Sequence, residues 1–150
     1  MKRALLLMLM VLLTTMSYNS FAQCKTPCKH KTSKCDTEKQ AQISKAEVMV
    51  YYFHNARRCA TCTAVEEITE KAIKDNFAEE LKSGKIGFIS LNIEEDKNKK
   101  LAEKLEVSGQ TLIIVKGEKK VNLTNDAFMY VKTKPEKLEA KIKKNLDKLV

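Results

Sequence analysis

The chain has 150 residues, a formal net charge of +9 and 43% hydrophobic residues. This length suffices for one domain with a hydrophobic core, so the five cysteines are not needed to hold a very small fold together. The lysines are scattered without interleaved aromatic side chains, which argues against a nucleic-acid-binding groove and favours a solvated surface.

Residues 1–22 have the layout of a secretory signal peptide. Lys2 and Arg3 precede an apolar run over 4–13 and a small-residue site that ends at Ala22. The apolar run is too short for a membrane-spanning helix, which needs about 18 residues or more. We expect cleavage after Ala22, no stable membrane span afterwards, and export to the periplasm or another extracytoplasmic compartment, where disulfides persist.

Residues 23–45 form a lysine-rich segment with few large apolar side chains, which predicts a flexible tail. The tail contains four side chains that are able to bind a soft metal ion, namely Cys24, Cys28, His30 and Cys35. A disulfide within the tail is an alternative. Lipidation at Cys24 is a further one, although Gln23 replaces the small residue that lipoprotein signals carry at that place.

Residues 46–150 show the pattern of an α/β domain. The β-branched and aromatic run 47–53 predicts a strand. Apolar residues at three- and four-residue spacing then predict a long amphipathic helix from near Cys59 to Leu81. The nearly continuous apolar run 86–93 is typical of a central strand that is covered on both faces.

The second half of this region continues the alternation. A helix is predicted to open at Glu94, Glu95 and Asp96, and strands over 111–115 and 119–123 form a hairpin. A final helix begins near Pro135, whereas 125–132 fits no element. The expected fold is a four-stranded mixed sheet in the order β-α-β-α-β-β-α, with helices on both faces.

Cys59 and Cys62 form a CxxC motif directly after the first strand, at the first turn of the long helix. The free N–H groups and the dipole of a helix N-terminus stabilise a thiolate at the first cysteine. Arg57 and Arg58 precede it and act in the same direction. We therefore expect Cys59 to be the attacking thiol and the more shielded Cys62 to be the resolving thiol.

The chain over 46–150 resembles thioredoxin. The resemblance lies in the order of the elements, in the placement of the CxxC and in the stretches KIGFISLNIEED, TLIIVKGEKK and PEKLEAKIKKNLDKL. It implies a thioredoxin-like fold and a thiol-disulfide oxidoreductase with Cys59 as attacking and Cys62 as resolving residue. Such an enzyme exchanges disulfides with protein or small-molecule thiols and needs no cofactor. We further expect a monomer.

Three departures from the thioredoxin pattern concern the surroundings of the dithiol. The motif is Cys-Ala-Thr-Cys, and the chain has no tryptophan. Where the family has a cis-proline that faces substrate, this chain has Gln110 followed by Thr111, and the resemblance implies that these two residues form the substrate-facing loop. We expect Gln110 to be trans, because a non-proline cis bond costs about 2.5 to 4 kcal/mol. The family's buried aspartate is missing too, which makes His54 and Glu66 candidates for proton transfer.

Two other function classes stay open at the level of sequence. One is a thioredoxin-like carrier of a soft metal such as Cu(I), which uses the dithiol together with His54 or with the tail cluster. The other is a non-catalytic relative that binds a partner protein. A zinc site inside the domain is disfavoured, because such a site normally requires a second pair of ligands.

Overall fold

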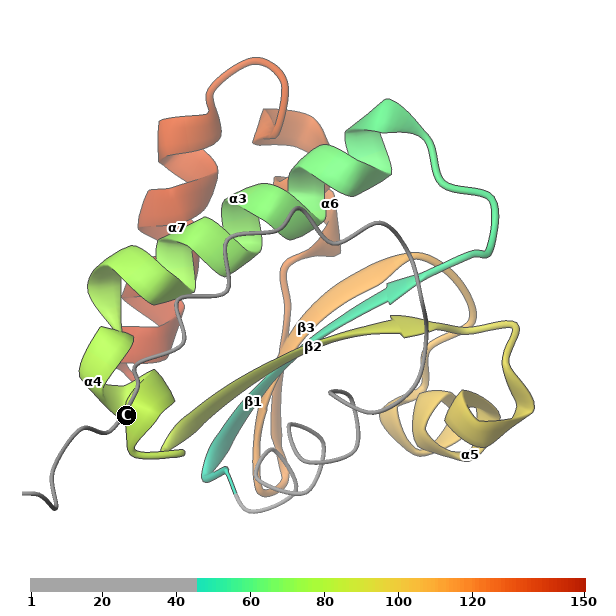
Figure 1. Ribbon diagram of the computed structural model, residues 1–150, viewed down its shortest axis with the longest axis horizontal. Helices are drawn as coiled ribbons and strands as arrows, with labels where there is room; N and C mark the ends of the chain where they lie inside the picture. Colours follow the sequence, from blue (N-terminus) through green and yellow to red (C-terminus); the bar gives the residue numbers. More distant parts are fainter. Residues whose placement is uncertain (1–45) are drawn as a thin grey trace, which may run out of the picture. The chain divides into compact units, whose positions relative to one another are not determined.

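The computed structural model describes residues 46–150, which form an α/β fold with a four-stranded mixed sheet flanked by helices (Figure 1). The predicted signal peptide 1–22, the predicted tail 23–45 and the tail cluster of Cys24, Cys28, His30 and Cys35 lie outside the described residues. Within 46–150, no helix is long and apolar enough to cross a membrane.

The sheet has the strand order β2-β1-β3-β4. Its strands are β1 (Val48–His54), β2 (Ile86–Asn92), β3 (Thr111–Lys116) and β4 (Lys119–Asn122). β1 pairs in parallel with β2 and antiparallel with β3, and β3 forms an antiparallel hairpin with β4. Gly117 takes a left-handed φ of 57° in the hairpin turn, where a residue without Cβ avoids a steric cost. The predicted mixed sheet is therefore confirmed.

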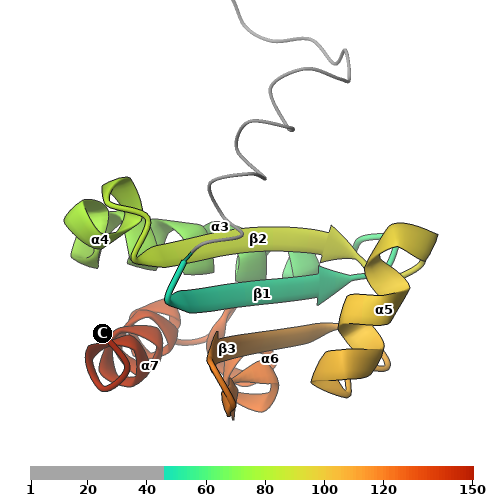
Figure 2. The same ribbon diagram turned by 90° about the horizontal axis from the view of Figure 1, so that it is seen from below.

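Helices cover both faces of this sheet. They are α3 (Ala60–Asn76), α4 (Ala78–Lys82), α5 (Asp96–Leu105), α6 (Thr124–Tyr130) and α7 (Pro135–Asp147). α3 and α7 lie side by side on one face, while α5 lies on the other (Figures 1 and 2). This three-layer arrangement places β1 between the two helical layers.

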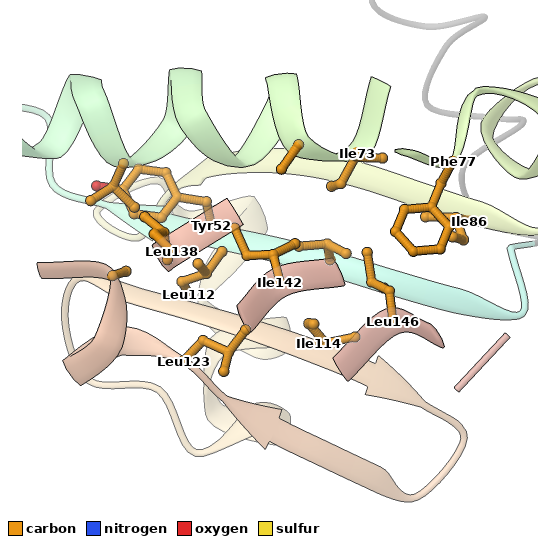
Figure 3. Packing of buried hydrophobic residues seen from close by; sticks show 14 of the residues in the cluster. Tyr52, Ile73, Phe77, Ile86, Leu112, Ile114, Leu123, Leu138, Ile142 and Leu146 are labelled. Atoms are coloured by element: carbon orange, nitrogen blue, oxygen red, sulfur yellow. The ribbon is translucent and has the colours of Figure 1, made fainter. Parts of the chain in front are cut away.

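The core follows the two-residue period of the strands, because successive side chains of a strand point to opposite faces. Tyr52 of β1 packs in the larger cluster beneath α3 and α7 (Figure 3), and Val50 belongs to the same cluster. Phe53 packs in the smaller cluster beneath α5. Leu138, Ile142 and Leu146 fill the apolar side of α7 at helical spacing. Leu149, three residues after Leu146, is buried just beyond the end of α7.

The structure corrects the sequence-based prediction at three places. The run 86–93 is not a central strand, because β3 pairs with the free side of β1 and leaves β2 at the sheet edge. The predicted helix to Leu81 is interrupted at the buried residue Phe77, whose φ of −136° and ψ of 36° are not helical. The stretch 125–132 fits no element by pattern, but most of it belongs to α6, a short helix that begins at Thr124. The buried Ala127, and Val131 just after the end of the helix, hold it against the core.

Glu106, at the end of α5, provides a test of local strain. It has a φ of 61° and a ψ of 37°, a left-handed conformation that costs a residue with a Cβ about 1 kcal/mol or more. We predict that Glu106→Gly raises the free energy of unfolding by about 1 kcal/mol. The exposed ion pair between Glu106 and Lys120 offsets little of this gain. Urea denaturation measures the change.

The matched control is Glu103→Gly, which lies within α5 and is exposed. There glycine should lower the free energy of unfolding by about 1 kcal/mol, because it adds backbone entropy to the unfolded chain without relieving strain. Effects of the same sign at both positions would contradict the assignment of strain to Glu106.

Candidate functional site

The two cysteines lie where the central strand leads into the first helix. β1 ends at His54, a loop over 55–58 follows, and α3 begins at Ala60. The backbone N–H of Ala56 donates to Glu94 Oε1 at 3.1 Å, which ties this loop to the turn after β2. The N-terminus of α3 therefore lies beside the C-terminal ends of β1 and β2.

Cys59 is the N-cap residue of α3. Its backbone is extended, with a φ of −94° and a ψ of 164°, and its Sγ accepts a hydrogen bond from the backbone N–H of Cys62 at 3.3 Å. This is the position at which Ser, Thr or Asp oxygens usually satisfy a free helical N–H. In this position the Cys59 sulfur receives a hydrogen bond from a backbone N–H and lies at the positive end of the helix dipole. Both stabilise negative charge on the sulfur.

The two thiols are free and differ in exposure. Cys59 is exposed, whereas Cys62 is buried with 1% of its surface accessible. This is the difference in shielding expected from the helical pattern. The two Sγ atoms lie 2.7 Å apart, and a disulfide bond needs about 2.05 Å, so a movement of less than about 1 Å closes the pair.

The pKa of Cys59 is lowered from 9.0 to about 7. The main cause is the hydrogen bond with the Cys62 side chain, followed by the hydrogen bond from the Cys62 backbone, whereas burial acts in the opposite direction. Because the thiolate is the nucleophile, the lowered pKa raises the reactive fraction of Cys59 at neutral pH.

Arg58, which we expected to stabilise the thiolate, forms a salt bridge with Glu66 on the second turn of α3. Arg57 is exposed on the loop. The leading causes of the lowered Cys59 pKa are hydrogen bonds and not the charges of these arginines. The contact also occupies the carboxylate of Glu66, one of the two candidates for proton transfer.

His54, the other candidate for proton transfer, lies at the end of β1. Its Nδ1 donates to the backbone carbonyl of Asn55 at 2.9 Å, and its ring lies 6.1 Å from that of Tyr52. Among the hydrogen bonds of residues 46–150, none joins His54 or Glu66 to either thiol.

Gln110 and Thr111 come next to the dithiol through sheet pairing. Thr111 lies opposite Phe53 in the antiparallel register of β1 and β3, so the residue before β3 lies beside the end of β1. The Cys62 thiol also lies within hydrogen-bond distance of Gln110 Oε1, at 3.4 Å. Thr111 is buried, and its hydroxyl donates to the carbonyl of Gly109 at 3.1 Å. All peptide bonds in the described part of the chain are trans, including those of Gln110, as expected.

Tyr52 is a residue of the site that sequence reasoning missed. It is fully buried in β1, and its hydroxyl donates to the backbone carbonyl of Cys62 at 3.0 Å. Burial, and secondarily the charge of Cys62, raise the pKa of Tyr52 to about 12, so the hydroxyl stays a donor. The available signal was a tyrosine in an apolar strand, since a buried hydroxyl needs a partner.

Within residues 46–150, no group of three or more His, Cys, Asp or Glu side chains is arranged to hold a metal ion. The chemistry that the described residues do support is thiol chemistry. The site consists of an exposed thiol of lowered pKa, a buried thiol beside it and a neutral amide next to the buried thiol.

No protein-family model matches the chain, and no curated protein does. One of the solved structures that match is described only as "Structure of a malarial protein". It is 24% identical over 55% of this chain and 92% of its own length, with a TM-score of 0.36.

The origin of the low Cys59 pKa leads to the first prediction for the site. In Cys62→Ala, which lacks the side-chain donor, the pKa of Cys59 should rise from about 7 toward its usual value. In Cys62→Ser, a hydroxyl donor replaces the thiol and should keep the pKa low. The rate of alkylation by iodoacetamide as a function of pH measures it, in full chains with Cys24, Cys28 and Cys35 replaced by serine.

Equal pKa values for Cys59 in the alanine and serine variants would contradict this origin. The charge of the arginines would then be the next cause to examine, by Arg57→Gln and Arg58→Gln.

The second prediction concerns the Tyr52 hydroxyl. Tyr52→Phe should lower the free energy of unfolding by about 0.5 to 1.5 kcal/mol, because it removes a buried hydrogen bond to the Cys62 carbonyl. Tyr51→Phe is the matched control, since Tyr51 lies next along β1 and is only partly buried. Urea denaturation compares them, and a larger loss in the Tyr51 variant would contradict the prediction.

Proposed function

We propose that this protein is an exported thiol-disulfide oxidoreductase of thioredoxin-like fold that works through Cys59 and Cys62. The observation that carries the proposal is the pair of free thiols at the N-terminus of α3. Their sulfur atoms are 2.7 Å apart, the exposed one has a pKa near 7, and the other is buried. This combination is what an attacking and a resolving thiol require.

The reaction begins at the exposed sulfur. The Cys59 thiolate attacks one sulfur of a substrate disulfide, a Cys59-substrate disulfide forms, and the other substrate sulfur leaves as a thiolate that takes a proton from water. The Cys62 thiol then loses its proton to water, and its sulfur attacks Cys59 Sγ. The Cys59-Cys62 disulfide forms and the second substrate thiol leaves. The substrate gains two electrons and the protein loses two.

The fold assignment is supported by the order and pairing of the elements. β1, α3, β2, α5, β3, β4 and α7 occur in the order that the resemblance to thioredoxin implies, with α4 and α6 as short additions. The dithiol lies at the first turn of the helix after the central strand, as the family pattern has it.

The sequence pattern supports an extracytoplasmic compartment, and the proposed chemistry indicates the partners. Residues 1–22 have the pattern of a signal peptide, and an extracytoplasmic compartment permits a dithiol to cycle. We propose protein or small-molecule thiols and disulfides as partners and a monomer as the working state, without a cofactor.

Redox titration tests the proposal. The full chain with Cys24, Cys28 and Cys35 replaced by serine is equilibrated with reduced and oxidised glutathione, and the Cys59-Cys62 disulfide is counted by alkylation and mass spectrometry. We expect a reversible two-electron transition between about −120 and −270 mV, the range of known exchange proteins. Its value decides between reduction and oxidation of substrates.

Cys62→Ser is the control, because its Cys59 should stop at a glutathione adduct without forming an internal disulfide. A pair that never exchanges with glutathione would contradict the proposal. In that case Cu(I) binding would be measured. Stoichiometric Cu(I) on the chain with all five cysteines, and its loss when Cys24, Cys28 and Cys35 are replaced by serine, would favour the soft-metal carrier.

A further inference from the structure

The Cys62 thiol has two acceptors within reach but only one proton to donate. Cys59 Sγ lies at 2.7 Å and Gln110 Oε1 at 3.4 Å. The proton therefore points to one of them at a time, and the charge on Cys59 decides which acceptor is the better one.

In the resting dithiol, the Cys59 thiolate is the stronger acceptor, because hydrogen bonds to an ionised sulfur exceed those to a neutral oxygen. This changes once Cys59 has formed a disulfide with substrate. Its sulfur is then neutral and a weak acceptor, which leaves the Gln110 carbonyl oxygen as the better partner. A proton that points to Gln110 leaves a lone pair of Cys62 free to face the Cys59 sulfur, the atom it must attack.

We propose that Gln110 is a positioning residue for the second step of disulfide exchange, because it draws the Cys62 proton away from Cys59. The inference rests on the proposed function. Gln110 is not a base, and the proton continues to water. A half-turn of the amide then brings its N–H groups to the Cys62 sulfur as charge develops there, which a neutral amide allows and an acceptor-only group does not.

The tertiary structure holds Gln110 in place for this role. β3 starts at the next residue, whose backbone is paired with β1 opposite Phe53. Gln110 is itself partly buried, whereas its sulfur partner is 1% exposed, so the thiol proton meets the Gln110 amide before it meets water. The residue that we predicted from sequence to face the substrate thus contacts the resolving thiol.

The experiment follows the two steps separately. The reduced full chain, with Cys24, Cys28 and Cys35 replaced by serine, is mixed with 5,5′-dithiobis(2-nitrobenzoate) in a stopped-flow instrument. Attack by Cys59 releases the first equivalent of the coloured thiol, and attack by Cys62 releases the second. Cys62→Ser should give the first equivalent alone, which assigns the phases.

Gln110→Met keeps the length of the side chain and removes its amide. We expect the second phase to slow about tenfold, the effect of one lost hydrogen bond to a developing charge, and the first phase to change much less. Ser108→Ala, an exposed change in the same loop, should leave both phases as they are.

Gln110→Glu provides an independent test with a pH profile. Its carboxylate accepts the thiol proton but opposes the Cys62 thiolate, so the second phase should shift to higher pH than in the unsubstituted protein. This variant decides the matter if Gln110→Met loses its fold, which circular dichroism would show.

A second phase that is unchanged in Gln110→Met, or two phases slowed equally, would overturn the role of Gln110 and leave the proposed function intact. An unshifted pH profile in Gln110→Glu would do the same. Absence of the first phase in the chain that keeps Gln110 would instead overturn the proposed function, and the role of Gln110 with it.

Discussion

The start of α3 at the end of the central strand is the constraint on which the rest of the site depends. A helix N-terminus has backbone N–H groups without internal partners, and here the Cys59 sulfur satisfies one of them. α3 is held against the sheet by Val65, Ala72 and Ile73, which are almost completely buried. The core therefore determines where the donors lie, and the donors determine the acidity of the exposed thiol.

The buried cysteine is held by three separate parts of the structure. Its N–H and its sulfur contact Cys59 on the same helix, its carbonyl accepts from Tyr52 on the strand below, and its thiol reaches Gln110 before the next strand. Each contact fixes a different group of Cys62. A residue with so many constraints keeps its sulfur within a short movement of the attacking sulfur, which suits a resolving thiol.

The two arginines beside the site are not the main cause of the lowered pKa of Cys59. Arg58 is paired with Glu66, and the pKa of Cys59 falls mainly through hydrogen bonds. Hydrogen bonds act over a fixed short distance and are little affected by salt, whereas an exposed charge is screened within about 10 Å. The low pKa of Cys59 therefore depends more on hydrogen bonds that the fold holds in place than on exposed charges.

The sequence alone determined the features that depend on local pattern. The strand at 48–54, the CxxC at a helix start and the last helix were predictable, because side-chain period and helix-end chemistry are properties of neighbouring residues. Only the tertiary structure decided that β2 lies at the sheet edge, that α6 exists and that Gln110 reaches Cys62. These features depend on which strands pair and on what buries a short helix, and contacts between residues 48 positions apart leave no periodic signal in the chain.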